Sequence, residues 1–181
     1  MRETNVQWTF VERQRGETPM EVFPEGISLM YRNILFVCTG NTCRSVMAQG
    51  LFKNMLRKEG IKDVKVSSAG IAALPSFAIY GVLEKVLKEE DIEISNHKPT
   101  RVTPQIVKDA DLILVMERRH KEAILEMAPE VKNRVFLLKE FAGEKKNLDI
   151  PDPIGQPEEA YRSRLQEIKG CLVKILEKIK K

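Results

Sequence analysis

The chain has 181 residues, 43% hydrophobic and 31% charged, which is enough apolar material for the core of one globular domain. Its net charge of +4 is mild, and its basic residues are spread out apart from a small cluster at Lys178, Lys180 and Lys181, so no nucleic-acid partner is expected. No apolar run is long enough to span a membrane, and three cysteines are too few for a disulfide framework, so no membrane partner is expected either.

Residues 1–30 are polar and mixed and show no stable hydrophobic period. They are expected to be either a loose extension or the product of a misplaced start, with translation beginning at Met30. No signal peptide is visible in this stretch, so the reducing cytosol is the expected compartment. His97 and His120 have no metal-ligand spacing with the cysteines, so neither a metal nor a cofactor is expected. The remaining residues, 31–181, form the single predicted domain.

The first half of that domain alternates short apolar runs with helical periods. Asn33–Val37 is predicted to be a buried strand that leads into a glycine-containing loop. A helix follows, which Gly60 ends, and Val64–Ser67 is a second strand that ends at residues 68–70. The apolar positions of the two predicted helices are Ala48, Leu51, Phe52, Met55 and Leu56, and then Ile79, Val82, Leu83, Val86 and Leu87.

The second half continues this alternation. Thr103 and Pro104 are typical of the first residues of a short helix, and Leu112–Met116 is the third predicted strand. A helix that ends before Pro129 and a strand at Val135–Leu138 follow, and the last helix carries apolar residues at helical spacing from Tyr161 to Ile179. Such an α/β pattern predicts a parallel sheet with helices on both faces. Active sites in these sheets lie beyond the carboxyl ends of the strands.

The loop after the first strand carries chemistry of its own. It reads Cys38, Thr39, Gly40, Asn41, Thr42, Cys43, Arg44 and Ser45. A tight loop that enters a helix directs backbone N–H groups at an anion, and an arginine fork binds two phosphate oxygens. The same field favours a thiolate, so Cys38 is the predicted nucleophile, with Ser45 as a hydrogen-bond donor to it. Gly40 and Asn41 suit the unusual backbone of such a loop.

A phosphate loop needs an acid for the leaving group, and Asp152 is the predicted one. Pro151 and Pro153 stiffen the segment that presents it. The alternative is that Asp152 only forms a turn beside the prolines.

The motifs Val37–Ser45, Met47-Ala48 and Asp152-Pro153 resemble the low-molecular-weight protein tyrosine phosphatase family, over residues 32–181. The resemblance implies a flavodoxin-like three-layer sandwich whose four-stranded sheet has the order 2-1-3-4. It also implies hydrolysis of phosphorylated protein side chains through a phosphocysteine on Cys38, with Arg44 and the loop amides binding the phosphoryl group. Asp152 then acts first as acid and next as base. Residues 67–70 and His97 also resemble family positions, and His97 is expected to be structural.

Two features favour phosphoarginine over phosphotyrosine as the substrate. Tyrosine-directed members usually place tyrosines after the acid, whereas this chain has Ile154, and the segment Ile71–Leu74 also lacks an aromatic residue. Thr42 resembles the protein-arginine phosphatase branch, as does the string Val135–Glu140. The alternatives are a tyrosine phosphatase in which Thr42 merely packs the loop, or a phosphate-binding or redox-sensing module without turnover.

The remaining cysteines have separate expectations. Cys43 is a small buried residue or the partner of Cys38 in a reversible disulfide that stops activity. Cys171 is expected in the core, beside the apolar stripe of the last helix. An arsenate reductase of the thioredoxin-coupled kind is disfavoured because residues 44–170 contain no cysteine. The expected assembly is a monomer that acts on phosphorylated proteins.

Overall fold

The computed structural model describes residues 31–74, 76, 81–94 and 96–180. The expectations for residues 1–30 lie outside this part of the chain, as does Ile79. The strands and helices in chain order are β1 (Asn33–Cys38), α1 (Arg44–Lys58), β2 (Lys65–Gly70), α2 (Gly81–Lys88), α3 (Pro104–Lys108), β3 (Leu112–Val115), α4 (Arg118–Met127), the 3-10 turn Pro129–Val131, β4 (Val135–Leu137), α5 (Leu138–Phe141) and α6 (Glu158–Ile179). No helix among the described residues is long and apolar enough to cross a membrane.

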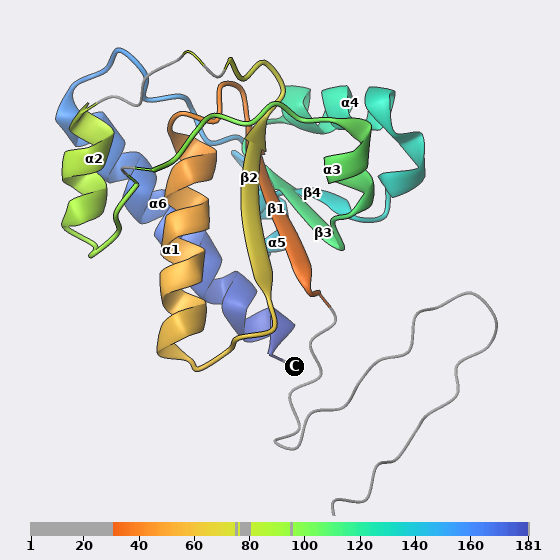
Figure 1. Ribbon diagram of the computed structural model, residues 1–181, viewed down its shortest axis with the longest axis horizontal. Helices are drawn as coiled ribbons and strands as arrows, with labels where there is room; N and C mark the ends of the chain where they lie inside the picture. The colour runs from red at the N-terminus through yellow and green to blue at the C-terminus, as the bar shows by residue number, and fades with distance from the viewer. Residues whose placement is uncertain (1–30, 75, 77–80, 95, 181) are drawn as a thin grey trace, which may run out of the picture.

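The four strands form one parallel sheet in the order β2-β1-β3-β4, so the predicted topology is confirmed (Figure 1). Side chains alternate across it, as the period of a strand requires. Along β1, Ile34 and Phe36 join one apolar cluster, which includes residues of α1, α2, α5 and α6, while Leu35 and Val37 join a second one with residues of α3 and α4. The domain is therefore a three-layer sandwich.

Strand β2 is longer than the sequence predicts. Residues 68–70 resemble a turn, yet Ser68, Ala69 and Gly70 continue the parallel register, up to the pair Cys38 and Gly70. Pairing with β1 therefore overrides the local turn preference of these small residues. At the other edge, β4 ends one residue early because Leu138 begins α5.

The helix boundaries follow their local signals. Thr103 caps α3 as predicted, because its hydroxyl accepts the backbone N–H of Ile106 at 3.3 Å and Pro104 takes the first helical position. Gly60 ends α1 with a φ of 72°, a left-handed conformation that glycine adopts without strain. The apolar face of α6 is buried, and Cys171 lies in it with 1% exposure, as expected.

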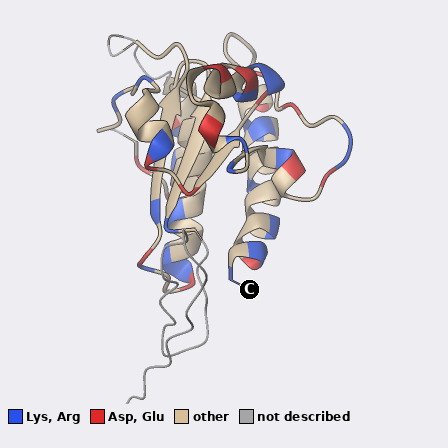
Figure 2. Cartoon of the chain, turned by 90° about the vertical axis from the view of Figure 1, so that its right-hand side faces the viewer, with Lys and Arg blue, Asp and Glu red and all other residues tan. Residues whose placement is uncertain are grey.

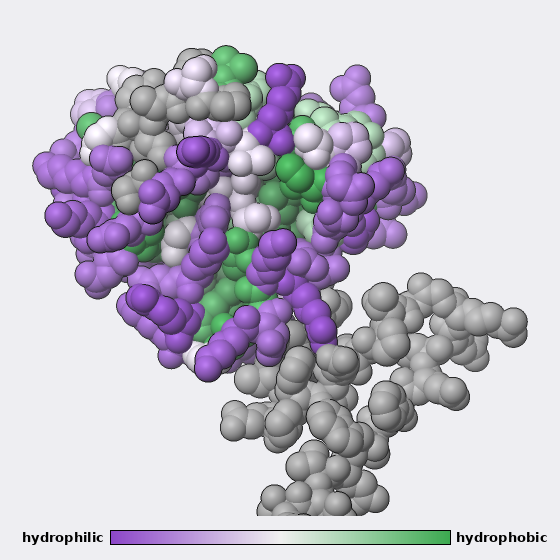
Figure 3. Space-filling view, viewed as in Figure 1, coloured by the Kyte–Doolittle hydropathy of each residue, from purple (hydrophilic) through white to green (hydrophobic). Residues whose placement is uncertain are grey.

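The surface of the domain mixes charges of both signs. Figure 2 shows blue and red segments near one another along the helix that leads to the C-terminus. Basic residues of α6 and its C-cap, Lys180, form ion pairs with acidic neighbours: Arg162 with Glu158, Lys169 with Glu90, and Lys180 with Glu59. Figure 3 shows mostly hydrophilic side chains on the face that Figure 1 presents, with smaller apolar areas between them.

Candidate active site

The loop between β1 and α1 wraps around the thiol of Cys38, which ends the strand. The Ser45 hydroxyl lies 3.0 Å from Cys38 Sγ, and the backbone N–H of Asn41 donates to the same sulfur at 3.3 Å. Cys43 is the N-cap of α1 and makes no side-chain cap bond, and no acidic residue occupies the first turn. The sulfur and the free amides of the helix start therefore share a region of positive potential that favours an anion.

Asn41 stabilises the conformation of this loop through its backbone geometry and its hydrogen bonds. Its φ of 54° lies in the left-handed region, which asparagine tolerates better than most residues. Its fully buried side chain donates to the hydroxyls of Ser45 at 2.9 Å and Ser68 at 2.8 Å, and accepts the backbone N–H of Thr100 at 2.8 Å. His97 donates from Nε2 to the Asn41 carbonyl at 2.9 Å, which agrees with the structural role expected for it.

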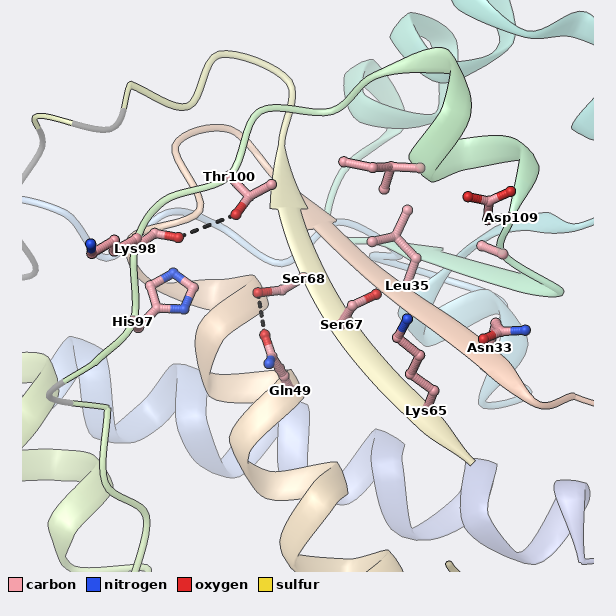
Figure 4. A pocket seen from close by; sticks show the side chains of 12 residues that line it. Asn33, Leu35, Gln49, Lys65, Ser67, Ser68, His97, Lys98, Thr100 and Asp109 are labelled. Carbon is pink, nitrogen blue, oxygen red and sulfur yellow. Dashed lines mark hydrogen bonds between the residues drawn. The ribbon is translucent and has the colours of Figure 1, made fainter. Parts of the chain in front are cut away.

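A pocket of about 350 Å³ lies behind this network, against the open edge of β2 (Figure 4). Gln49, Ser67, Ser68 and His97 line it, and Figure 4 shows the Ser68 hydroxyl bonded to the Gln49 side chain. Cys38 and the other predicted catalytic residues are not part of its lining. This pocket therefore borders the residues that hydrogen-bond to Asn41, such as Ser68 and His97, and not the sulfur of Cys38.

Arg44 is the most buried charged side chain of the site, with 1% exposure. Its Nη1 donates to the carbonyl of Ile150 at 2.9 Å and to the carboxylate of Glu117, and its Nη2 lies 2.5 Å from Asp152 Oδ2. Nε is the only buried side-chain nitrogen or oxygen of the described residues that has no hydrogen-bond partner. A buried donor without an acceptor is costly, so the Nε–Nη2 edge is ready to bind an oxygen anion.

Asp152 reaches the loop from the segment before α6. The backbone N–H of Ile150 donates to the Met116 carbonyl at 2.8 Å, which fixes this segment to the end of β3. The Asp152 side chain is 30% exposed and its second oxygen accepts the backbone N–H of Ile154 at 3.2 Å. The structure therefore brings Asp152 to the loop that contains Cys38 and Arg44, although 108 residues separate Asp152 from Arg44 in the sequence.

Three residues of this site were not predicted from the sequence: Glu117, Arg119 and His120. Glu117 Oε2 lies 2.8 Å from Arg119 Nε, and His120 Nδ1 accepts the backbone N–H of Glu117 at 3.1 Å. His120 Nε2 therefore carries the proton of the neutral ring and donates to the Thr39 hydroxyl, 2.9 Å away. Their position just after the third strand, at the same sheet edge as Cys38, was the available signal.

The charges of this cluster are shifted by their surroundings. Burial, together with the positive charge of Arg44, lowers the pKa of His120 from 6.5 to about 4, so the ring is neutral near pH 7. Hydrogen bonds from Arg119 and Arg44 outweigh the effect of burial and lower the pKa of Glu117, so its carboxylate is charged. Burial raises the pKa of Cys43, and the neighbouring Cys38 adds to this rise, so the Cys43 thiol stays protonated.

The residues predicted to set specificity lie around the loop. Thr42 is buried, with 4% exposure. Ile154 and Leu74 are exposed apolar side chains, on the acid segment and on the segment after β2. The second segment contacts the loop, since Ala72 N–H donates to the Thr39 carbonyl at 2.9 Å. Groups of three or more potential metal ligands are absent from the described residues.

Known proteins are similar to this chain in both sequence and fold. A protein-arginine-phosphatase of Bacillus subtilis (strain 168) is 36% identical over 149 residues, 82% of this chain and 97% of the relative. The low molecular weight protein-tyrosine-phosphatase Wzb of Escherichia coli (strain K12) is 34% identical over 132 residues, 73% of this chain and 84% of Wzb. A solved structure of the YwlE arginine phosphatase, a mutant with a phosphorylated active site serine, aligns with a TM-score of 0.76 at 35% identity, over 82% of this chain and 96% of that chain.

The family model for low molecular weight phosphotyrosine protein phosphatase matches residues 33–181. This range contains the loop from Cys38 to Ser45, Arg44 at its end and Asp152. The chain therefore belongs to the low molecular weight phosphotyrosine protein phosphatase family and is a cysteine-based phosphatase.

Proposed function

We propose that Cys38, Arg44 and Asp152 hydrolyse phosphorylated protein side chains in two steps. The observation that carries this proposal is the thiol of Cys38, whose Sγ lies 3.0 Å from the Ser45 hydroxyl at the start of α1. The same loop carries Arg44, whose Nε has no hydrogen-bond partner among the described residues. These are the parts that nucleophilic attack on a phosphoryl group requires.

In the first step the Cys38 thiolate attacks phosphorus, an S–P bond forms, and the bond to the leaving group breaks. Asp152 gives its proton to the leaving nitrogen or oxygen. In the second step water attacks phosphorus and loses a proton to the Asp152 carboxylate, while the S–P bond breaks and the thiolate returns. Arg44 and the loop amides hold the phosphoryl oxygens throughout, so binding of the substrate exchanges the Arg44 contact with Asp152 for one with phosphate.

Phosphoarginine is the substrate that we favour. Relatives from Bacillus subtilis and Geobacillus stearothermophilus, at 36% and 38% identity, are named protein-arginine-phosphatases. The aliphatic side chains of Ile154 and Leu74 offer no ring to stack on phosphotyrosine. Phosphoarginine instead presents a planar, polar group to which the Asp152 carboxyl can donate and accept hydrogen bonds. The second candidate is phosphotyrosine, which the name of the Wzb relative supports at 34% identity.

The test compares turnover of one peptide sequence with either phosphoarginine or phosphotyrosine, by wild type and by Cys38→Ser. We expect a higher kcat/KM for the phosphoarginine peptide, and no turnover of either by Cys38→Ser. Higher kcat/KM for phosphotyrosine would reassign the substrate, whereas turnover by Cys38→Ser would refute the mechanism.

We also propose that residues 31–181 are the whole catalytic domain, acting as a monomer in the cytosol, where a reducing environment keeps the Cys38 thiol free. The family match over residues 33–181 supports this boundary. A chain that lacks residues 1–29 is expected to retain the kcat/KM and the melting temperature of the full chain. A large fall in either would give residues 1–29 a role in the domain.

A further inference from the structure

Glu117 lies directly behind the guanidinium group of Arg44. It follows the carboxyl end of β3 and is the N-cap of α4, where the backbone N–H of Glu117 donates to His120 Nδ1 at 3.1 Å. Its side chain is 18% exposed and bonds to Arg44, which is 1% exposed. The carboxylate is thus held by the fold at the edge of the sheet that carries the phosphate loop.

The hydrogen bonds of Arg44 divide its guanidinium into two sides. Nη1 has two hydrogens, and its acceptors are Glu117 Oε1 and the Ile150 carbonyl, the latter at 2.9 Å. Nε has no acceptor in the described part of the chain, and Nη2 contacts the side chains of Asp152 and Thr39, at 2.5 and 3.4 Å. One side is therefore anchored to the protein, and the Nε–Nη2 edge is the one that is available to a ligand.

Arg119 in turn fixes Glu117. Its Nε lies 2.8 Å from Glu117 Oε2, and its Nη2 donates to Glu117 Oε1 at 3.0 Å. Arg119 is 56% exposed, so it reaches the carboxylate from the solvent side, while Arg44 reaches it from the interior. The carboxylate thus has little freedom to turn away from Arg44.

We propose that Glu117 is the positioning residue of this phosphatase: it holds Arg44 so that the Nε–Nη2 edge faces the phosphoryl group, and Arg119 supports it. This inference rests on the proposed role of Arg44 in binding phosphate. A guanidinium fork binds two oxygens of a phosphoryl group only when its plane is aligned with them. The fixed Nη1 supplies that alignment before the substrate arrives, so the transition state is stabilised without reorganisation of Arg44.

The charge of Glu117 and its hydrogen bond have opposite effects on an anionic substrate. A carboxylate near the site repels phosphate, so its charge alone would weaken binding. The hydrogen bond to Arg44 favours catalysis through alignment. Substitutions that remove the charge alone, or the charge and the acceptor together, therefore separate the two effects.

The experiment measures kcat/KM with para-nitrophenyl phosphate for Glu117→Ala, Glu117→Gln and the control Glu126→Gln. We expect roughly a ten-fold loss for Glu117→Ala, the size expected when a hydrogen bond to a charged group is removed. Glu117→Gln keeps an acceptor oxygen and should recover most of the wild-type value. Glu126 is exposed on the same helix and is expected to leave kcat/KM unchanged.

Arg119→Ala provides a second test on an exposed residue, where the fold is not at risk. Alone it should lower kcat/KM by about three-fold, and most of this effect should vanish in the Glu117→Ala background, because the two residues act through one contact. An unchanged Glu117→Ala, or equal losses in Glu117→Ala and Glu117→Gln, would overturn the positioning role. If Glu117→Ala does not fold, an unchanged Arg119→Ala would overturn it. Loss of wild-type turnover is a separate result, since it would refute the proposed function itself.

Discussion

Gly70 lies against the backbone of Thr39 in the phosphate loop. A Cβ atom added to Gly70 would stand 2.5 Å from the Thr39 carbonyl oxygen and 2.7 Å from the backbone nitrogen of Asn41. Both neighbours are backbone atoms, so no side-chain rotation relieves the clash. The last residue of β2 thus packs directly against the backbone of the phosphate loop, and only glycine fits at this position.

Gly70→Ala adds only one methyl group, yet it is expected to lower kcat/KM strongly. The added methyl group should cost about 1–3 kcal/mol of stability. Because the atoms that must move belong to Thr39 and Asn41, kcat/KM should fall by more than roughly ten-fold. Unfolding in urea and kcat/KM with para-nitrophenyl phosphate measure the two effects.

Gly170→Ala is the matched control. Gly170 lies inside α6, and a Cβ there would meet nothing within 4 Å. Alanine in a helix interior should raise stability by about 0.5–1 kcal/mol and leave kcat/KM unchanged. Similar activity of Gly70→Ala and Gly170→Ala would show that the loop does not depend on the Gly70 contact.

Asp152→Asn should slow the hydrolysis of poor leaving groups far more than that of good ones. A poor leaving group needs the proton that Asp152 supplies, whereas para-nitrophenol leaves without it. The measurement is kcat/KM over a series of aryl phosphates of increasing leaving-group pKa. An equal loss across the whole series would rule out Asp152 as the acid.

His120 should make the stability of the protein fall below neutral pH. Its folded pKa of about 4 lies below the ordinary value of 6.5, so the unfolded chain binds more protons as the pH falls between these values. The stability that the neutral ring contributes is complete above pH 6.5 and is lost toward pH 4. Between pH 7.5 and pH 5 the loss should be about 2 kcal/mol.

Urea unfolding of wild type and His120→Gln at these two pH values tests this effect of His120. His120→Gln should be less stable than wild type at pH 7.5, because the hydrogen bond from His120 Nε2 to Thr39 is removed. The free energy of unfolding of the variant should change less than that of wild type between pH 7.5 and pH 5. An identical pH dependence in both proteins would contradict the prediction.

Thr42→Ile should shift preference from phosphoarginine toward phosphotyrosine. Thr42 lies in the phosphate loop and carries a hydroxyl that can hydrogen-bond to a polar substrate, whereas isoleucine replaces this group with apolar surface. Loss of a polar contact is worth about 1–3 kcal/mol, which corresponds to roughly ten- to hundred-fold in selectivity. The ratio of the two kcat/KM values in wild type and variant is the measurement. An unchanged ratio would mean that Thr42 only packs the loop.

Mild peroxide should inactivate the enzyme, and dithiothreitol should restore it by reducing a disulfide between Cys38 and Cys43. Both thiols are free and buried, and burial raises the pKa of Cys43, so its thiol is protonated. Once peroxide has oxidised Cys38 to a sulfenic acid, the Cys43 sulfur can condense with it to a disulfide and release water. Capture by Cys43 then prevents further oxidation. Cys43→Ala should recover much less activity than wild type, and full recovery of this variant would exclude the protective disulfide.

The sequence alone determined those features of this protein that arise from residues close to one another along the chain, namely its strands, most of its helices and the phosphate loop. The periods of apolar residues predicted the four strands and the longer helices, because burial imposes a repeat of two on strands and of about three and a half on helices. The short helix α5 was not predicted, since Leu138 reads as the end of the preceding strand. The spacing of Cys38 and Arg44 predicted the phosphate loop, because that loop is one short segment between a strand and a helix. Asp152 was predicted because a phosphate loop needs an acid.

The tertiary structure decided which distant residues meet at that loop. Thr39 bonds to His120, 81 residues away, and Arg44 bonds to Asp152, 108 residues away, and no local pattern encodes such pairs. Glu117 meets Arg44 because the parallel sheet places the end of β3 beside the end of β1. From the sequence, Gly70 was expected to follow the second strand. Its pairing with Cys38 in the parallel register places it against the backbone of the phosphate loop. These contacts depend on strand order and register, because those bring the carboxyl ends of separate strands to one edge of the sheet.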